Sequence, residues 1–375
     1  MKPYDTYKDS GIGWIGKIPS HWEVKKFNYL FNFSRGLSIT KQDLKDEGIP
    51  CVNYGEIHSK FGFKINPEEH FLKSVESDYM KSSSKSLLRR GNFVFADTSE
   101  DIEGSGNFTC LDSDTPTFAG YHTIIAIQRE NNNYIYLAYF FDSLEFRNQI
   151  RSEVSGIKVF SITQSILKTT NVLLPPKSEQ IAIALFLDHK TTEIDQLIAD
   201  KKRLIEFYEE EKTAVINQAV TKGIDSNVKL KDSGIEWLGE IPEHWEVKRF
   251  RYFFDLITEK RENNRNKIGL ENIESKTGKF IETESDFEGQ GICFEKDDIL
   301  FGKLRPYLAK VWLADSEGQA VGDFYIFRSK KSVFSQYAKY KLLDTAFIEI
   351  TNSSTYGSKM PRVNWEFIAN LLMAL

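Results

Sequence analysis

The sequence predicts an α+β protein in which two related globular units stand in tandem, joined by one long helix. Three observations predict this: a 20-residue segment occurs twice, an uninterrupted helical stripe lies between the copies, and each unit mixes short β-prone runs with short helical patterns. The 375 residues suffice for two or three domains. A composition of 41% hydrophobic and 27% charged residues is that of a globular protein and excludes wholesale disorder.

The repeat is the strongest signal. Residues 8–27 read KDSGIGWIGKIPSHWEVKKF and residues 231–250 read KDSGIEWLGEIPEHWEVKRF, so 15 of 20 positions are identical. Weaker correspondences join 91–97 with 297–303, and 156–174 with 357–375. The segments between these landmarks hardly resemble each other. The shared segments should serve a common packing role or contact a common partner. The divergent segments should contact two different ligands or two different sequences.

The stretch 178–222 predicts one long helix. It follows Pro175-Pro176, contains no Gly or Pro, and ends before Gly223. At ~1.5 Å per residue it spans roughly 65 Å. A lone amphipathic helix is marginal in water, so its apolar stripe should bury against another helix. The residues predicted to make that contact are Ile194, Leu197, Ile198, Leu204, Ile205, Tyr208 and Val215.

The flanking units show the expected mixture of strands and helices. β-prone runs lie at 93–95, 122–127, 299–301 and 325–327, and helical patterns lie at 135–150 and 336–348. We therefore expect a first domain at 1–175, the central helix at 176–222, a linker at 223–231 and a second domain at 232–375.

Several protein classes are disfavoured. No apolar run approaches the ~18 residues of a membrane span, and the start, MKPYDTYKDS, lacks the apolar region of a secretory signal. Three widely spaced cysteines fit a reducing cytoplasm better than a disulfide frame or a zinc site. The net charge of −5 argues only weakly against nucleic-acid binding, because local patches matter more than the sum.

Catalytic motifs are weak. GIGWIG at 11–16 matches a dinucleotide-binding pattern, but no strand precedes it and the second copy has Glu236 in place of Gly13, which favours a structural turn. His21 and His244 each precede a Trp and could act in acid–base chemistry, although packing on the ring is the better interpretation.

A metal-dependent nuclease is a rival hypothesis. Each copy places an Asp before Glu-x-Lys: Asp9 with Glu23 and Lys25, and Asp232 with Glu246 and Lys248. Trp-Glu-Val-Lys reads equally well as an alternating strand. The sequence shows no phosphate-binding loop and no His/Cys cluster with metal-ligand spacing. Binding, without a metal or cofactor of its own, is therefore the better default, and a scaffold without DNA contacts is a third possibility.

Basic segments mark the places where nucleic acid could bind. KSSSKSLLRR, KRENNRNK and GKLRPYLAK combine cations with polar or aromatic residues, although each could also be a solvated face. The predicted DNA-binding residues are Lys81, Lys85, Arg89, Arg90, Lys260, Arg261, Arg265, Lys267, Lys303 and Arg305, together with Arg35, Lys41, Lys158 and Lys359.

The twin motif D-S-G-I-x-W-[LI]-G-x-I-P-x-H-W-E-V resembles the specificity subunit of type I restriction-modification systems. So do LPPKSEQIAIALFLDHKTTEIDQLIADKKRLIEFYEEEKTAVINQAVTKG at 174–223, RGLSITKQDL at 35–44 and ILFGKLRPYLAKV at 299–311. The resemblance implies two target-recognition domains, each reading one half of a split double-stranded DNA site. It also implies a coiled-coil spacer that docks methyltransferase subunits. Chemistry is then left to partners: an S-adenosylmethionine-dependent adenine methyltransferase and an ATP- and Mg²⁺-dependent restriction subunit.

One departure from the family pattern accompanies the resemblance. Members normally carry a second conserved helix after the second recognition domain, and this sequence stops at Leu375, before that helix. The expectation is a helix that pairs with a second copy or a separately encoded fragment, a shortened or silent variant, or a trimmed sequence.

Overall fold

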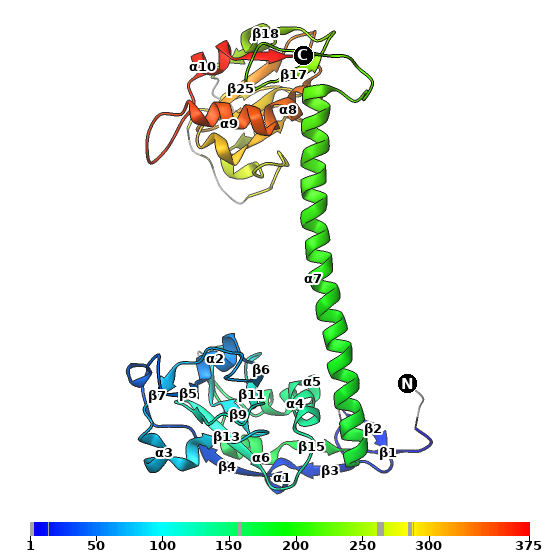
Figure 1. The fold of residues 1–375 in the computed structure, drawn as a ribbon, viewed down its shortest axis with the longest axis vertical. Helices are drawn as coiled ribbons and strands as arrows, with labels where there is room; N and C mark the ends of the chain where they lie inside the picture. Colours follow the sequence, from blue (N-terminus) through cyan, green and yellow to red (C-terminus); the bar gives the residue numbers. More distant parts are fainter. Residues whose placement is uncertain (1–3, 14, 157–158, 261–265, 284–286, 288) are drawn as a thin grey trace. The chain divides into compact units, whose positions relative to one another are not determined.

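The computed structural model describes residues 4–13, 15–156, 159–260, 266–283, 287 and 289–375. Two compact units, Met1–Ile198 and Ala199–Leu375, divide the chain, and the boundary falls inside one long helix. The predicted fold class, α+β units on either side of a central helix, is confirmed (Figure 1).

The central helix α7 (Lys177–Lys222) runs for 46 residues without a break. It begins directly after Pro175-Pro176, which cannot extend a helix backward, and the amides of Glu179 and Gln180 donate to the Pro176 carbonyl. It ends at Gly223, whose φ of +80° is a left-handed conformation that glycine adopts without strain. Both ends therefore follow from local sequence.

The first unit is built on a sheet whose described strands run in the order β4-β13-β9-β11-β6. They are β4 (Phe31–Arg35), β13 (Thr123–Gln128), β9 (Phe93–Ala96), β11 (Phe108–Leu111) and β6 (Phe63–Ile65). Neighbours pair antiparallel except β6, which runs parallel to β11. The predicted runs at 93–95 and 122–127 form the central strands.

Both faces of this sheet are covered, and the pleat explains why Phe93–Ala96 is wholly buried. Phe93 and Phe95 point into one core with helices α4 (Tyr134–Asp142) and α5 (Leu144–Arg151). Val94 and Ala96 point into the opposite core. That second core includes α2 (Tyr54–Ser59) and part of a smaller sheet of order β7-β5-β12-β8.

The remaining elements of the first unit are short. The smaller sheet contains β5 (Ile49–Val52), β7 (Ser74–Val75), β8 (Leu87–Leu88) and β12 (Thr117–Ala119). Further strands are β1 (Tyr7–Asp9), β2 (Lys17–Pro19), β3 (Glu23–Lys26), β10 (Thr98–Ser99), β14 (Phe160–Ser161) and β15 (Asn171–Leu174). Short helices are α1 (Phe27–Leu30), α3 (Tyr79–Ser82), α6 (Gln164–Thr169), η1 (Lys41–Asp43) and η2 (Ser84–Ser86).

The second unit repeats this plan around a sheet of order β19-β25-β22-β23. The strands are β19 (Phe254–Ile257), β25 (Phe324–Ser329), β22 (Ile299–Gly302) and β23 (Val311–Leu313). A smaller sheet holds β20 (Lys267–Ile268), β24 (Gly318–Ala320) and β21 (Ile292–Phe294). Helices are α8 (Ser335–Leu343), α9 (Thr345–Ser353), α10 (Trp365–Asn370), η3 (Phe250–Tyr252), η4 (Leu270–Asn272) and η5 (Pro306–Leu308).

The helical patterns at 135–150 and 336–348 each form two helices instead of one. Ser143 leaves the helical conformation with ψ of 150°, and its side chain accepts from the Phe146 amide as the N-cap of α5. Asp344 leaves it with ψ of 135° between α8 and α9. Each break turns the chain so that both helices face the same core.

The repeated motif closes each unit onto its own last strand. β3 pairs with β15 in the first unit, and β18 (Val247–Arg249) pairs with β26 (Leu372–Ala374) in the second. The preceding pairs are also equivalent, β1 with β2 and β16 (Leu230–Asp232) with β17 (Glu240–Pro242). β16 begins within the segment expected as a linker. In the described part of the chain, no helix has the combined length and apolar character that crossing a bilayer requires.

Candidate nucleic-acid interface

The repeated turn is structural in both copies. Asp9 and Asp232 each accept the amide of the glycine two residues later at 2.8 Å. The glycines with positive φ are Gly11 and Gly16 in the first copy and Gly234 and Gly239 in the second. Gly13, replaced by Glu236 in the second copy, is absent from this set. The turn therefore uses the motif's outer glycines for backbone shape, not for binding a dinucleotide.

The His-Trp pair of the first copy holds the start of α7. His21 Nε2 lies 2.6 Å from Glu179 Oε1, and the Trp22 indole and the Tyr4 hydroxyl each donate to Oε2 at 3.0 Å. Burial opposes ionisation of Glu179, but the hydrogen bonds from Trp22, His21 and Tyr4 outweigh it and keep the pKa of this carboxyl below its usual range. The motif thus docks a helix in the first unit.

One end of the main sheet gathers polar residues in the first unit. Thr123 at the start of β13 pairs with Ala96 at the end of β9, and Ile124 pairs with Arg35 at the end of β4. The Asp97 amide then donates to the His122 carbonyl at 3.1 Å. Hydrogen bonds from Ser86 Oγ to the Arg35 carbonyl and from Ser34 Oγ to the Lys85 carbonyl bring the KSSSK segment to the same end.

Two loops meet at this end, described over residues 97–107 and over 152–156 with 159–161. We call the segments 97–107 and 152–161 the paired loops of the first unit. They are joined where β10 pairs with β14, and where the Ile162 amide donates to the Asp97 carbonyl at 2.8 Å. A hollow of about 730 Å³ lies beside them. Its walls include Tyr54, His58, Thr98, Asp101, Asn107 and His122.

The hollow is built on a directed hydrogen-bond chain. Arg147 Nη1 donates to Asn107 Oδ1 at 2.5 Å, so the Asn107 amide nitrogen faces His58 Nδ1 at 2.8 Å as a donor. His58 Nε2–H then donates to the Thr98 carbonyl at 2.8 Å. This order fixes His58 as one neutral tautomer and holds the first loop in place. His122 remains at the surface, with Nδ1 3.1 Å from Asp97 Oδ1.

The second unit has the same backbone arrangement. The Lys303 amide donates to the Asp323 carbonyl at 2.9 Å, and the Val363 amide donates to the Lys303 carbonyl at 3.1 Å. Leu304 forms a β-bridge with Arg362, as Thr98 does with Ser161. Residues 303–310 and 354–363 are therefore the paired loops of the second unit. Lys303 and Asp323 occupy the places of Asp97 and His122.

Comparison with known proteins gives the family. A family model described as "Type I restriction modification DNA specificity domain" matches residues 19–206, about half of the chain.

The chain belongs to this family.

Relatives and solved structures agree with the assignment. The putative type I restriction enzyme MjaX specificity subunit of Methanocaldococcus jannaschii is 28% identical over 298 residues, 78% of this chain and 63% of that protein. The EcoKI specificity subunit of Escherichia coli is 23% identical over 252 residues, 66% of this chain and 50% of that protein. The chain thus spans less than two thirds of these relatives. The HsdS crystal structure from Thermoanaerobacter tengcongensis has a TM-score of 0.59 at 13% identity, covering 96% of this chain and 85% of that chain, which supports the fold.

Within this family fold, the structure brings some predicted residues together. Arg35 and Lys85 lie at the loop end of the first unit's sheet. Lys260, just beyond the end of β19, lies at the corresponding end in the second unit, with Lys303 and Arg305 just beyond the end of β22. Lys359 belongs to the second of the paired loops there.

Other predicted residues lie elsewhere. Arg89 and Arg90 precede β9 and so lie at the opposite end of the sheet, where Arg90 pairs with Asp112 and Asp114 at 3.3 and 3.1 Å. Lys41 lies in η1, Lys81 lies in α3 and Lys267 lies in β20. All three are outside the paired loops. Lys158, Arg261 and Arg265 are outside the described residues. The assignment of all these residues to DNA binding stays a prediction.

Sequence reasoning missed Arg362, the best-held cation of the second unit's loops. Its Nε and Nη2 donate to the two oxygens of Asp323 at 2.9 and 2.7 Å, and these hydrogen bonds raise the pKa of the guanidinium. A usable signal existed, because Arg362 follows Lys359 by three residues in the segment that aligns with 156–174.

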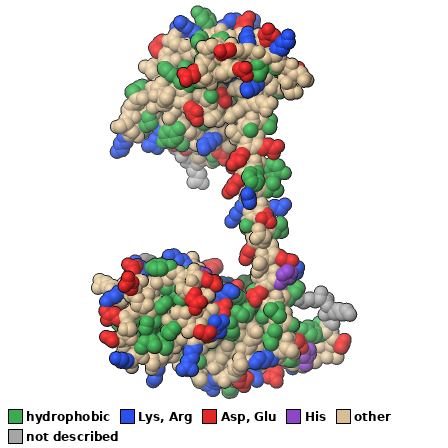
Figure 2. Space-filling model, viewed as in Figure 1, with side chains coloured by type: hydrophobic (Ala, Val, Ile, Leu, Met, Phe, Trp, Pro, Cys, Tyr) green, Lys and Arg blue, Asp and Glu red, His purple; other side chains and the backbone are tan. Residues whose placement is uncertain are grey.

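The apolar face of α7 is exposed in the described structure. The seven residues predicted to pack on a partner helix are between 39% and 60% exposed. Hydrophobic side chains lie among charged ones along the surface of this helix (Figure 2). Their burial against another helix stays a prediction.

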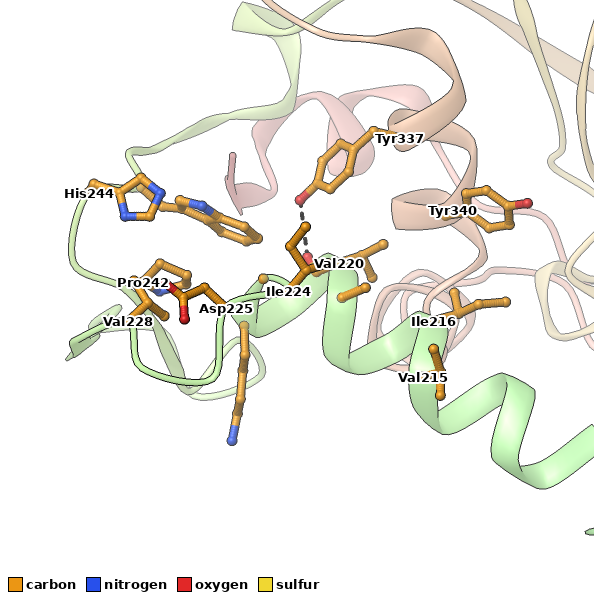
Figure 3. A pocket seen from close by; sticks show the side chains of 14 residues that line it. Val215, Ile216, Val220, Ile224, Asp225, Val228, Pro242, His244, Tyr337 and Tyr340 are labelled. Carbon is orange, nitrogen blue, oxygen red and sulfur yellow. Dashed lines mark hydrogen bonds between the residues drawn. The ribbon is translucent and has the colours of Figure 1, made fainter.

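The end of α7 is clamped within the second unit. The Tyr337 hydroxyl donates to the Val220 carbonyl at 3.2 Å (Figure 3). Lys341 Nζ donates to the same carbonyl at 2.8 Å. Burial lowers the pKa of Lys341 to about 8. An apolar hollow of about 560 Å³ lies beside this clamp, lined in part by His244 and Trp245. The second His-Trp pair faces this hollow, and His244 has no hydrogen-bond partner among the described residues.

The nuclease hypothesis gains no support from this geometry. Asp9 and Asp232 are used in turns, and Glu23 and Glu246 pair with Lys25 and Lys248 along the strand. Across the described ranges, no group of three or more His, Cys, Asp or Glu side chains is placed to hold a metal ion.

Proposed function

We propose that this chain is the DNA sequence-recognition subunit of a type I restriction-modification complex. The observation that carries the proposal is the loop end of the main sheet, which is built twice with the same backbone hydrogen bonds and different side chains. A protein that reads two different half-sites needs this combination, because a common frame positions each reading surface and unlike side chains distinguish the bases.

Each unit reads one half of a split double-stranded target. The first recognition domain is residues 1–175 and the second is residues 232–375. Residues 176–222 set the distance between the half-sites and dock methyltransferase subunits. The exposed apolar face of α7 supports a protein-contact role for this helix, since exposed apolar stripes of this length mark interaction sites.

The chain contributes recognition and leaves the chemistry to its partners. We assign adenine methylation to S-adenosylmethionine-dependent methyltransferase subunits and cleavage to an ATP-dependent restriction subunit, all in the cytoplasm. The turn and strand roles of the candidate nuclease carboxylates agree with this division.

The test is a methylation map. The chain is expressed with the methyltransferase encoded beside it, modified adenines are sequenced, and cells with the methyltransferase alone serve as the control. The expected result is one split motif with two unlike halves. Absence of any new methylation contradicts the proposal and returns weight to a non-DNA scaffold or a silent form.

A second candidate is a subunit that works only when another chain covers α7. The exposed residues from Ile194 to Val215 favour it. A palindromic split motif in the same map supports this reading, because two copies then pair and each uses the same unit.

A further inference from the structure

We propose that the paired loops of the second unit form a phosphate-binding surface that anchors the DNA backbone, a role that the first unit's paired loops do not share. The inference rests on the proposed function in taking DNA as the partner. It adds which surface supplies the sequence-independent part of the affinity, and from which residues.

The backbone of this surface is fixed before any ligand arrives. The Arg305 amide donates to the Pro361 carbonyl at 2.8 Å, and Tyr356 and Arg362 exchange two hydrogen bonds of 3.0 Å. Arg305 and Ala309 hold left-handed conformations, with φ of +51° and +47°, on either side of η5. Such conformations cost free energy for residues with a side chain and persist where the surrounding contacts determine them. The loops therefore present their side chains from a rigid base.

The charges of this surface are strongly one-sided. The paired loops of the second unit contain no carboxylate of their own, and Lys303 and Arg362 lie beside that of Asp323. Arg362 occupies both of its oxygens, and Lys303 Nζ lies 3.9 Å away over the ring of Tyr325. The cations of these loops are Lys303, Arg305, Lys310, Lys359 and Arg362. One carboxylate cannot balance five cations, so these loops keep an excess of positive charge.

Two of these cations are available to a ligand. Arg305 and Lys359 are exposed, and neither side chain has a hydrogen-bond or ion-pair partner among the described residues. Tyr307 and Tyr356, on the same loops, are also exposed and add hydroxyl donors. Asp323 orients Arg362, so that its guanidinium stiffens the second loop beside the free cations.

The residue types favour phosphate over a base edge. Residues 303–310 and 354–363 contain no Asn, Gln, Asp or Glu. Their side chains can donate hydrogen bonds, but they lack the amide and carboxylate acceptors that read adenine and cytosine. A phosphodiester is an acceptor with a full negative charge, which matches a surface made of donors and cations.

The first unit supplies the contrast. Its loop 97–107 carries Asp97, Glu100, Asp101 and Glu103 and has no Lys or Arg. Lys158 is the one cation in the sequence of its partner loop 152–161. Arg147 and Arg151 reach this loop from α5, through hydrogen bonds to Asn107 and to the Glu103 carbonyl. The loop's own carboxylates repel phosphates, so equivalent loop residues in the two units cannot contact the backbone in the same way.

The experiment measures the salt dependence of DNA binding. The full chain is titrated against fluorescent duplexes of arbitrary sequence between 50 and 300 mM KCl, and log K is plotted against log [salt]. Arg305→Gln and Lys359→Gln should each lower the magnitude of the slope by about 0.9, the value for one lost phosphate contact. Circular dichroism melting confirms that each variant is folded.

A matched control keeps the charge change and moves its position. Lys331 is exposed, has no partner among the described residues, and follows the far end of β25 from Asp323. Lys331→Gln should leave the slope at the wild-type value. Asp97→Asn in the first unit should leave the slope unchanged, and its DNA affinity should be equal to or higher than that of the wild type.

Three outcomes overturn the inference: a wild-type slope in both loop variants, an equal loss in Lys331→Gln, or a loss confined to G·C duplexes and absent from A·T duplexes, which identifies base reading. These outcomes are independent of the methylation map. If the methylation map shows a split motif but the two loop variants keep the wild-type salt slope, only the phosphate-binding surface is rejected. If the loop variants change the slope but no methylation appears, only the specificity-subunit function is rejected.

Discussion

The end of β9 in the first unit and the end of β22 in the second occupy the same place in their sheets and carry opposite charges. Asp97 faces His122 in one, and Lys303 faces Asp323 in the other, yet the amide-to-carbonyl hydrogen bond between the two positions is the same. Main-chain hydrogen bonds therefore hold these loops in place, which leaves the side chains free to differ between the two units.

The cores of the two units differ as well. Phe141 in α4 touches the rings of Phe27, Phe93 and Phe146 with centroids 4.6 to 5.3 Å apart. Its counterpart in α8 is Leu342, which is equally buried. The first unit thus relies on a cluster of aromatic rings where the second has an aliphatic side chain.

The largest expected effect on stability comes from a substitution in the aromatic core of the first unit. Phe141→Ala should lower the free energy of unfolding of the first unit by about 4 kcal/mol, because it removes a buried ring and leaves a cavity. Leu342→Ala should cost the second unit about 3 kcal/mol. Hydrogen exchange read on peptides of each unit measures both. Equal hydrogen-exchange protection of the first unit in the wild type and in Phe141→Ala contradicts the prediction.

The clamp at the end of α7 gives a pH-dependent difference. Since the folded pKa of Lys341 is about 8, the unfolded state binds more protons above that pH, and stability rises as the pH rises. Between pH 8 and 9.5 the second unit should gain about 1–2 kcal/mol. Phe140 occupies the matching place in the first unit, which should lack this gain. The readout is denaturant unfolding at both pH values; a gain that persists in Lys341→Met assigns it to another group.

The two His-Trp pairs should contribute different amounts to the free energy of unfolding. His21→Ala removes a hydrogen bond to the ionised Glu179 and should cost about 1 kcal/mol in the first unit. The contribution of Glu179 is present above its ordinary pKa and is lost as the pH falls through its lowered pKa, so the cost should vanish in strong acid. His244→Ala should cost less, which melting of both variants at pH 7 and pH 3 can check. If His21→Ala and His244→Ala lose the same stability at pH 7, the predicted difference between the two pairs is wrong.

The smallest effects belong to the repeated turn. Gly13→Glu copies the second unit and should change stability by less than about 0.5 kcal/mol. Gly16→Ala places a side chain at φ of +67° and should cost about 1 kcal/mol. Thermal melting separates the two, and a larger loss for Gly13→Glu counts against the turn interpretation.

Local sequence predicted much of the fold. The bounds of α7 follow from a proline pair, a glycine and an unbroken stripe, and the strands at 93–95 and 299–301 are short apolar runs that sheets bury on both faces. The helix breaks at Ser143 and Asp344 were missed, because single polar residues within an apolar pattern read as exposed helix positions until their cap geometry is known.

The candidate interface could be predicted only in part. Lys303, Arg305 and Lys359 stand out by local composition, but their convergence depends on contacts between segments that lie more than 40 residues apart. The hydrogen bonds from Arg362 to Asp323 join positions 39 residues apart, and no local pattern announces them. Sequence gives the chemistry of single segments, and the sheet decides which segments meet.

The charge inversion at the sheet ends limits how the side chains at these positions can change one at a time. Asp97 Oδ1 lies 3.1 Å from His122 Nδ1, and Lys303 Nζ lies 3.9 Å from Asp323 Oδ1. Replacing His122 alone by Asp places two carboxylates side by side, and like charges in facing positions destabilise a sheet. Replacing Asp97 alone by Lys removes the carboxylate that His122 contacts. Replacing one residue pair by the other through single substitutions therefore passes through a less stable variant. Exchange of a whole unit by recombination avoids it, since both partners travel together.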